Sequence, residues 1–155
     1  MITYKFDQNI FDSQCQTLVN TVNCVGVMGK GLALQFKEKY PLMYKEYLRA
    51  CSQGLLKSGG DLWLWQEPFI LPFCEMPPRS QVLCFATKEH WSNPSQYRWV
   101  DRGLHTLAQE YEKMGITSIA LPKLGCTNGG LDWGTVKGLM EMVLGDLPLR
   151  VEIYC

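Results

Sequence analysis

A glycine-rich stretch, NTVNCVGVMGKG at residues 20–31, carries the first residue types that suggest chemistry. Asn20 and Asn23 lie at the end of an apolar segment, and glycines then alternate with small apolar residues as far as Gly31. Glycine lets the backbone approach a ligand closely, and an amide side chain can hydrogen-bond ribose hydroxyls. The stretch therefore predicts a loop that binds a phosphate or a sugar. The alternatives are a tight turn without a ligand, and asparagines that only cap backbone groups.

The glycine spacing does not fit the common nucleotide-binding loops. The pattern G-x-x-x-x-G-K-[ST] fails because Gly26 lies only three residues before Gly29, and because Gly31 stands where a metal-binding Ser or Thr is required. The pattern G-x-G-x-x-G is absent as well. The sequence supports neither an NTPase nor a nicotinamide dinucleotide enzyme.

A second glycine-rich stretch, KLGCTNGG at residues 123–130, follows another apolar segment. In an open α/β sheet, loops at the carboxyl ends of strands line the ligand crevice, and helix N-termini at that edge favour anions. Two such loops predict a diphosphate-containing ligand that is held from both sides.

Lys88, in ATKEHW at residues 86–91, is the candidate nucleophile. It follows the apolar segment VLCFA, so a strand would deliver it to the same edge as the glycine loops. Beside a sugar and Trp91, its amine would be partly desolvated, and desolvation lowers the pKa of a lysine. An unprotonated amine can attack a carbonyl-like carbon. The alternative is an ordinary solvated surface lysine.

Metal and disulfide chemistry have little support. The histidines are His90 and His105, without carboxylates at ligand spacing, and we expect His105 on a helix surface. The 7 cysteines are odd in number and form no C-x-x-C pair. We expect reduced, mostly buried thiols, no metal and no cofactor.

Strand-like and helix-like segments alternate along the chain and must position these residues. Strands are predicted at residues 2–6, 16–22, 61–65, 81–87, 116–122 and 149–155. Helices are predicted at 32–40, at 41–53 with Pro41 in the first turn, from a Ser95 cap to about Met114, and from an Asp132 cap to Leu144. The proline-rich segment 67–80 is predicted to be a loop with one edge strand.

The 155 residues suffice for one domain with a substantial core. Lys+Arg 15 balance Asp+Glu 15, so no overall basic field directs the chain to nucleic acid, and any such contact needs a local patch. No stretch approaches the ~18 apolar residues of a membrane span, and the first residues lack the apolar run of a signal peptide. We expect a cytoplasmic monomer.

Three stretches carry a resemblance to a known family. LVNTVNCVGVMGKGLALQFKEKYP, ATKEHW and LPKLGCTNGGLDW, in this order, resemble macrodomains, and among them the DarG-type DNA ADP-ribosyl glycohydrolases. The resemblance spans nearly the whole chain and is weakest between residues 56 and 80. It implies an α/β macrodomain over residues 1–155, with a mixed central β-sheet sandwiched between helices. Whether this is the excised N-terminal catalytic domain of a longer chain or a stand-alone relative stays open.

The resemblance also implies a function. DarG-type macrodomains are antitoxins that remove ADP-ribose from thymidine bases in single-stranded DNA and so reverse a DarT-type toxin. The implied partners are ADP-ribose, ADP-ribosylated single-stranded DNA and a DarT-type toxin, without a membrane. Two alternatives stay open: a non-catalytic ADP-ribose-binding module, and a hydrolase of protein-linked ADP-ribose, ADP-ribose 1″-phosphate or O-acetyl-ADP-ribose.

The resemblance assigns roles to particular residues. Lys88 matches the catalytic lysine of this branch, which would engage the anomeric carbon of the ribose, in one form as a Schiff base with the ring-opened aldehyde. The first glycine loop would surround the distal ribose and the second the diphosphate. The implied ADP-ribose ligands are Asn9, Ile10, Asn20, Asn23, Gly26, Val27, Met28, Gly29, Lys30, Gly31, Thr87, Gly125, Cys126, Thr127, Asn128, Gly129, Gly130 and Leu131.

The sequence departs from the family pattern at two places. Macrodomains usually begin with Gly-Asp-Ile/Leu, whose aspartate reads the adenine amine, whereas this chain has Asn9 at the aspartate position. The branch that acts on proteins carries a catalytic aspartate in the second glycine loop, where this chain has Gly129. Asp132 follows three residues later and is predicted to be the helix cap.

Overall fold

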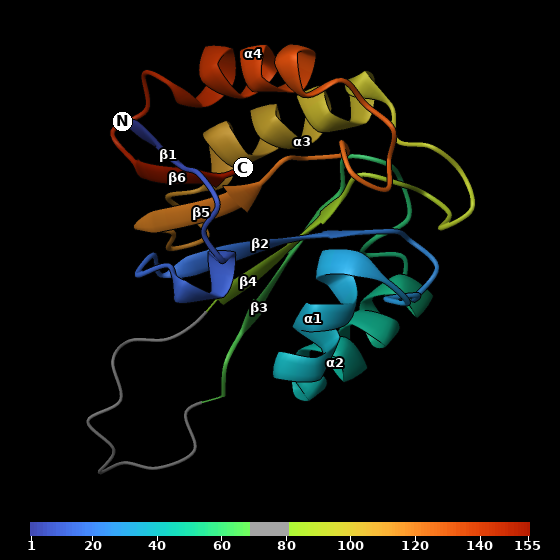
Figure 1. Ribbon diagram of the computed structural model, residues 1–155. Helices are drawn as coiled ribbons and strands as arrows, with labels where there is room; N and C mark the ends of the chain where they lie inside the picture. The colour runs from blue at the N-terminus through green and yellow to red at the C-terminus, as the bar shows by residue number, and fades with distance from the viewer. Residues whose placement is uncertain (69–80) are drawn as a thin grey trace, which may run out of the picture.

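The computed structural model describes residues 1–68 and 81–155, which form one sheet with helices on both faces (Figure 1). The strand order of the six-stranded sheet is β1-β6-β5-β2-β4-β3. Only β3 runs antiparallel to its neighbour β4, and the other described pairs are parallel. The strands are β1 (Ile2–Lys5), β2 (Thr17–Val22), β3 (Leu62–Gln66), β4 (Gln81–Ala86), β5 (Ser118–Pro122) and β6 (Arg150–Tyr154).

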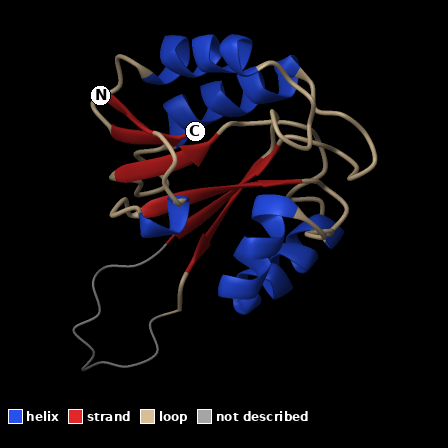
Figure 2. Cartoon of the chain, in the orientation of Figure 1, coloured by secondary structure: helices blue, strands red, loops and turns tan. Residues whose placement is uncertain are grey.

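The helices cover the sheet in two pairs (Figure 2). α1 (Gly31–Lys39) and α2 (Pro41–Ser52) pack on one face, and α3 (Tyr97–Glu110) and α4 (Trp133–Leu144) on the other. A short 3₁₀ helix, Ile10–Asp12, lies between β1 and β2. The predicted mixed sheet between helices is confirmed. None of the described helices is long and apolar enough to cross a membrane.

Strand β4 shows why both faces need helices. Leu83 and Phe85 join the core under α3 and α4, whereas Val82, Cys84 and Ala86 join the core against α1 and α2. Successive side chains of a strand point to opposite faces, so a continuous apolar run buries itself only when both faces are covered.

Two predicted helix starts have different outcomes. Asp132 is the N-cap of α4, as predicted, because its carboxylate accepts a hydrogen bond from the Thr135 N–H at 3.0 Å. The prediction of Ser95 as a cap is wrong, since α3 begins at Tyr97 after Gln96. The Ser95 N–H instead donates to the Gly129 carbonyl at 3.0 Å, so Ser95 is bonded to the second glycine-rich stretch and not to the helix.

The cysteines differ in part from the expectation. Cys15 and Cys84 are buried, whereas the other described cysteines are partly exposed, and all of those described are unpaired: Cys15, Cys24, Cys51, Cys84, Cys126 and Cys155. Cys74 and the predicted edge strand of segment 67–80 lie outside the described residues, except for Glu67 and Pro68, which are in no strand.

Candidate functional site

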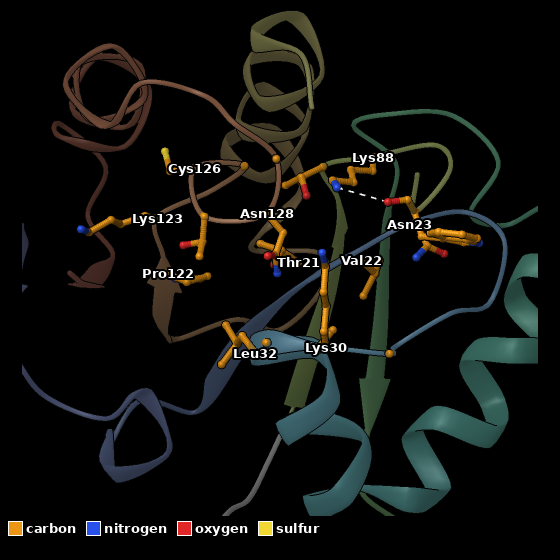
Figure 3. Close-up of a pocket in the computed structure, with 18 of the residues that line it drawn as sticks. Thr21, Val22, Asn23, Lys30, Leu32, Lys88, Pro122, Lys123, Cys126 and Asn128 are labelled. Carbon is orange, nitrogen blue, oxygen red and sulfur yellow. Dashed lines mark hydrogen bonds between the residues drawn. The ribbon is translucent and has the colours of Figure 1, made fainter. Parts of the chain in front are cut away.

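A cavity of about 620 Å³ opens where the carboxyl ends of β2, β4, β5 and β6 meet (Figure 3). Its size falls within the range of small-molecule sites, and this edge of a parallel sheet is the usual ligand crevice. The walls come from both glycine-rich loops and from the segment after β4. Thr21 and Val22 lie at its base, Cys126 and Lys123 on one side, and Lys88 on the other.

Asn23 shapes the first glycine loop, residues 23–31. Its side-chain oxygen accepts hydrogen bonds from the Val25 and Val27 N–H groups at 3.0 and 3.3 Å and from the Tyr47 hydroxyl at 3.0 Å. Its amide nitrogen donates to the Val27 carbonyl at 2.7 Å. Asn23 lines the cavity, but these contacts make it the internal brace of the loop. The capping alternative that the sequence left open is therefore realised at this residue.

The side chains of Asn20 and Met28 are buried and do not lie on the cavity wall. Asn20 is fully buried, and its amide nitrogen lies 3.7 Å from the Met28 sulfur, which is buried too. Among the described residues the side-chain oxygen of Asn20 has no partner. Gly26 adopts φ +84°, a left-handed conformation that favours glycine, and supports the turn without lining the cavity.

The first glycine loop delivers the N-terminus of α1 to the cavity. Lys30 is the N-cap and makes no side-chain capping hydrogen bond, and the first turn holds no acidic residue. Gly31, Leu32 and Ala33, whose N–H groups precede the first helical hydrogen bond, all line the cavity. Uncapped N–H groups and the positive end of the helix dipole form an anion site.

The second glycine loop, residues 125–131, is built differently. It closes on itself through the Leu131 N–H, which donates to the Gly125 carbonyl at 3.0 Å, and it is tied to Ser95. The N-terminus of α4 is occupied, because the Asp132 carboxylate accepts from both the N–H and the hydroxyl of Thr135. Any anion contact on this side must therefore come from the loop itself or from lining side chains such as Lys123 and Asn128, rather than from a helix end.

Gly129 has no room for a side chain. A Cβ at this position would lie 2.2 Å from the Ser95 hydroxyl oxygen and 2.3 Å from the Gly125 carbonyl oxygen. An aspartate at residue 129 is thus incompatible with this backbone, which explains in physical terms the departure seen in the sequence. Asp132 is committed to its helix cap.

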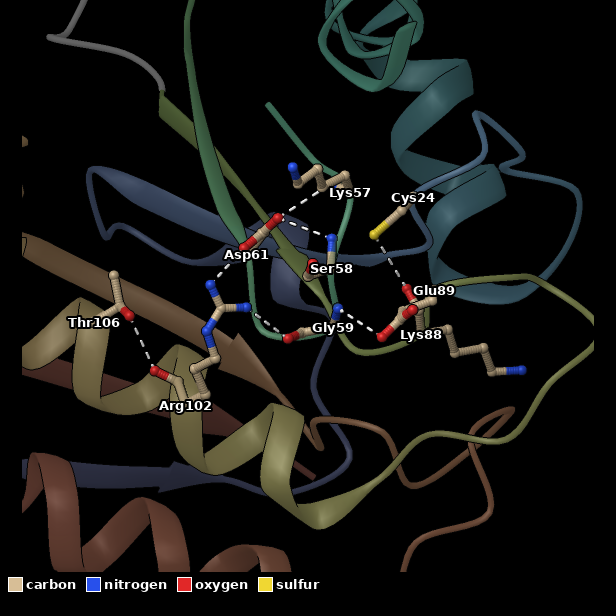
Figure 4. Close-up of polar contacts among 9 residues, drawn as sticks. All are labelled: Cys24, Lys57, Ser58, Gly59, Asp61, Lys88, Glu89, Arg102 and Thr106. Atoms are coloured by element: carbon tan, nitrogen blue, oxygen red, sulfur yellow. Dashed lines mark hydrogen bonds and ion pairs between the residues drawn. The ribbon is translucent and has the colours of Figure 1, made fainter. Parts of the chain in front are cut away.

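Lys88 is held by backbone contacts to the start of the first loop. The Val22 carbonyl accepts from the Thr87 and Lys88 N–H groups at 3.1 and 3.4 Å, and the Cys24 N–H donates to the Glu89 carbonyl at 3.1 Å. The Cys24 thiol lies 3.6 Å from the Lys88 carbonyl (Figure 4). Burial raises the pKa of Cys24 to about 12, so the thiol keeps the proton with which it donates.

The amine of Lys88 is only weakly partnered. Its Nζ donates to the Trp91 carbonyl at 3.3 Å (Figure 3), and within residues 1–68 and 81–155 no carboxylate forms an ion pair with it. Burial and then the nearby charge of Lys30 lower the pKa of Lys88 below its usual range. Both causes favour the unprotonated amine, which is the nucleophilic form.

A network of hydrogen bonds that the sequence did not reveal, the buttress, joins the loop at residues 57–61 to Arg102 and supports the segment of Lys88. Asp61 accepts from the Lys57 and Ser58 N–H groups at 3.0 and 2.9 Å and pairs with Arg102 of α3 at 2.8 Å (Figure 4). The same arginine donates to the Gly59 carbonyl at 2.8 Å. Burial opposes ionisation, but these hydrogen bonds and the arginine lower the pKa of Asp61 overall.

The buttress reaches the lysine segment through Glu89, whose carboxylate accepts from the Gly59 N–H at 3.4 Å. No spacing in the sequence links Asp61 to Arg102, which lie 41 residues apart. In the sequence, only the paired glycines of KSGGD at residues 57–61, just before a strand, indicate that this loop approaches other backbone closely.

The structure brings together most of the predicted site residues. Those that line the cavity are Asn23, Val27, Gly29, Lys30, Gly31, Thr87, Lys88, Gly125, Cys126, Thr127, Asn128 and Gly129. Those that do not are Asn9, Ile10, Asn20, Gly26, Met28, Gly130 and Leu131. Asn9 instead caps the 3₁₀ helix through the Phe11 N–H at 3.0 Å, and Ile10 is buried in the core.

Some lining residues were missed by the sequence analysis. They share a place at strand ends or in the first turn of α1, and the signal for them was this position alone: Thr21, Val22, Leu32, Ala33, Pro122, Lys123, Tyr154 and Cys155. In the described part of the chain, no group of three or more His, Cys, Asp or Glu side chains is placed to hold a metal ion.

Comparison with known proteins agrees with this geometry. The family model described as Macro domain matches residues 19–140. A DNA ADP-ribosyl glycohydrolase of Mycobacterium tuberculosis is 39% identical over 148 residues, which are 96% of this chain and 40% of the relative. The chain thus spans about two fifths of the length of the curated relatives it matches.

Solved structures resemble the whole chain. The macrodomain of Mycobacterium tuberculosis DarG has a TM-score of 0.87 at 39% identity and covers 99% of this chain and 97% of its own. Thermosipho africanus DarTG in complex with ADP-ribose also has a TM-score of 0.87, at 37% identity over 97% of this chain and 41% of its own.

Proposed function

This chain belongs to the Macro domain family, and we propose that it is a hydrolase that releases ADP-ribose from thymidine bases in single-stranded DNA. The observation that carries the proposal is the amine of Lys88, which lies at the cavity, forms no ion pair with a carboxylate of the described residues and has a lowered pKa. The similar DNA ADP-ribosyl glycohydrolases support DNA as the carrier of the ADP-ribose. A transferase of the DarT type is the partner that would create this substrate.

ADP-ribose is proposed to bind with its diphosphate between the start of α1 and the second glycine loop. Gly31, Leu32 and Ala33 offer uncapped N–H groups on one side, and Gly125 and Cys126 belong to the opposite wall. Both walls present backbone, which suits an anion without needing arginine. The distal ribose would then lie toward Lys88.

The proposed reaction begins with the amine of Lys88. Its lone pair forms a bond to C1″ of the ribose while the bond from C1″ to the thymine nitrogen breaks, and that nitrogen takes the electron pair and then a proton. Opening of the ribose ring moves the C1″–O4″ electrons to O4″ and leaves a Schiff base with Lys88. Addition of one water releases ADP-ribose and the unmodified lysine.

The leaving group matches the absence of an acid at residue 129. In thymine the linked nitrogen lies between two carbonyl groups, which delocalise the departing electron pair. An imide therefore leaves with less help from a general acid than an alcohol does. The packing of Gly129 against Ser95 is consistent with a site that does not use an aspartate there.

Replacement of Lys88 tests the proposal. Lys88→Ala should abolish release of ADP-ribose from an oligonucleotide with ADP-ribosylated thymidine, measured by chromatography of the products. Calorimetry should show nearly unchanged ADP-ribose binding, because the amine contributes mainly in the transition state. Lys88→Arg should also be inactive, since a guanidinium keeps its proton and is no nucleophile.

Lys113→Ala is the matched control, because the side chain of this lysine is 80% exposed in the turn after α3, and the variant should keep full activity. Recovery of activity in Lys88→Arg would show that the role of the lysine is electrostatic. Activity in Lys88→Ala would show that Lys88 is not the nucleophile. A wild-type chain that binds ADP-ribose but releases none from DNA or from ADP-ribosylated protein would be a reader of ADP-ribose instead.

A further inference from the structure

Trp91 presents an aromatic surface at the cavity that the core does not use. The residue is 54% exposed although it lines the cavity, whereas Trp65 and Trp99 are buried. The ring packs at 5.2 Å and 31° against that of His90. Trp91 thus combines exposure to solvent with a place at the cavity, next to the turn that carries Lys88.

The position of Trp91 is fixed relative to the amine of Lys88. The Trp91 carbonyl accepts the hydrogen bond from Lys88 Nζ, so the backbone that carries the indole also orients the nucleophile. The turn is closed further by His90, whose Nδ1 accepts from the Ser92 N–H at 3.1 Å and lies 2.6 Å from the Ser92 hydroxyl. The indole and the amine are thus carried by one short, internally bonded turn.

The chemistry of the substrate places a planar group beside this turn. An amine that displaces the base from C1″ approaches opposite the breaking bond, so the base lies across C1″ from Lys88 and within reach of a large side chain on the same turn. A nucleobase has a π face that stacks on an aromatic side chain, whereas an aliphatic amino-acid side chain has none. The net charge of +0 gives no general attraction to nucleic acid, so a local contact has to supply it.

We propose that Trp91 is the platform on which the ADP-ribosylated base stacks, and that it determines the preference of the site for base-linked over amino-acid-linked ADP-ribose. This inference rests on the proposed function, because it takes the DNA base as the leaving group. Stacking would hold the base while Lys88 reacts and would bind base-linked substrate more tightly than free ADP-ribose.

The test uses binding, so that it does not depend on turnover. Trp91→Leu and Trp91→Phe are made in the Lys88→Ala background, and calorimetry measures a single-stranded oligonucleotide with one ADP-ribosylated thymidine and, separately, ADP-ribose. Trp91→Leu should weaken oligonucleotide binding roughly tenfold, as expected for loss of one stacked base, and leave ADP-ribose binding unchanged. Trp91→Phe keeps a π face and should restore most of the affinity.

Two results would overturn the inference: equal oligonucleotide affinity with and without Trp91, or an ADP-ribose affinity that falls in parallel with it. The proposed function fails separately, if the chain with Lys88 intact releases no ADP-ribose from the oligonucleotide. With Lys88 intact, Trp91→Leu should raise KM far more than it lowers kcat, which a merely structural turn residue would not do.

Discussion

The two glycine-rich loops look alike in sequence but meet the cavity in different ways. The first is braced by Asn23 and ends at a helix whose N-terminus carries no side-chain cap. The second is packed against Ser95 and ends at a helix that Asp132 already caps. At Gly29 the first loop has room for a side chain and leads to a free helix end, whereas at Gly129 the second loop has no room and leads to a helix end that is already capped. Similar glycine content thus goes with an uncapped helix N-terminus in one place and with close packing in the other.

The largest effect is expected from a charge placed in the first loop. Gly29→Glu should reduce ADP-ribose affinity at least ~100-fold, about 2.7 kcal/mol, because its carboxylate would repel the diphosphate at the start of α1. The fold should tolerate the change, since a Cβ at Gly29 meets only Val27 at 3.6 Å. Calorimetry on Gly29→Gln separates charge from bulk, and undiminished affinity in Gly29→Glu would refute the anion site.

The contrast in packing predicts that replacing glycine by alanine destabilises the fold at Gly129 of the second loop but not at Gly29 of the first. Gly129→Ala should lower the free energy of unfolding by about 2 kcal/mol or more, because a buried Cβ would overlap the Ser95 side chain and the Gly125 carbonyl. Gly29→Ala should stay within ~0.5 kcal/mol of wild type. Urea unfolding of both variants measures the difference, and equal stability would mean that the second loop repacks freely.

Removal of the cap on α4 should cost stability without affecting the ligand. Asp132→Ala loses the contacts to Thr135 and should lower the free energy of unfolding by about 1 kcal/mol. ADP-ribose affinity should stay unchanged, because neither Asp132 nor the first turn of α4 lines the cavity. A clear change of affinity measured by calorimetry would show that this helix end does take part in binding.

The smallest effect concerns the charge at the start of α1. Lys30 lowers the pKa of Lys88, and the reaction needs the unprotonated amine, so the rate should rise with pH through that pKa. Lys30→Gln removes the repulsion, raises the pKa of Lys88 and should move the rising limb of the kcat/KM profile to higher pH. A shift to lower pH would contradict the assignment of Lys88 as the group whose deprotonation limits the rate.

The features predicted well from the sequence are those that local pattern determines. Asp132 is a helix cap, and Lys88 follows a strand, because each depends only on neighbouring residues. The features that were missed depend on contacts between distant segments. Asn20 and Asn23 look equivalent in sequence, yet only Asn23 reaches the cavity, since Asn20 points into the core beneath Met28.

Ser95 shows the same limit from the other side. Its residue type suits a helix cap, but its N–H donates a hydrogen bond to the Gly129 carbonyl, which holds Ser95 against the second loop. The bond between Asp61 and Arg102 joins residues that the fold alone brings together. Composition and spacing predict the sheet and the loops, whereas such pairs follow only from three-dimensional packing.

The backbone bonds between Val22, Cys24 and the segment 87–89 have a consequence for how this site can be altered. The first glycine loop and the segment of Lys88 leave the adjacent strands β2 and β4 and stay hydrogen-bonded as far as Cys24 and Glu89, so the register between them is fixed past the strand ends. An insertion before Cys24 or between Thr87 and Glu89 would break this register and shift Lys88 relative to the first glycine loop. Any transplant of Lys88 in this geometry into another macrodomain therefore has to carry both segments together with the turn at His90 and Trp91, because the Trp91 carbonyl accepts the hydrogen bond from Lys88 Nζ.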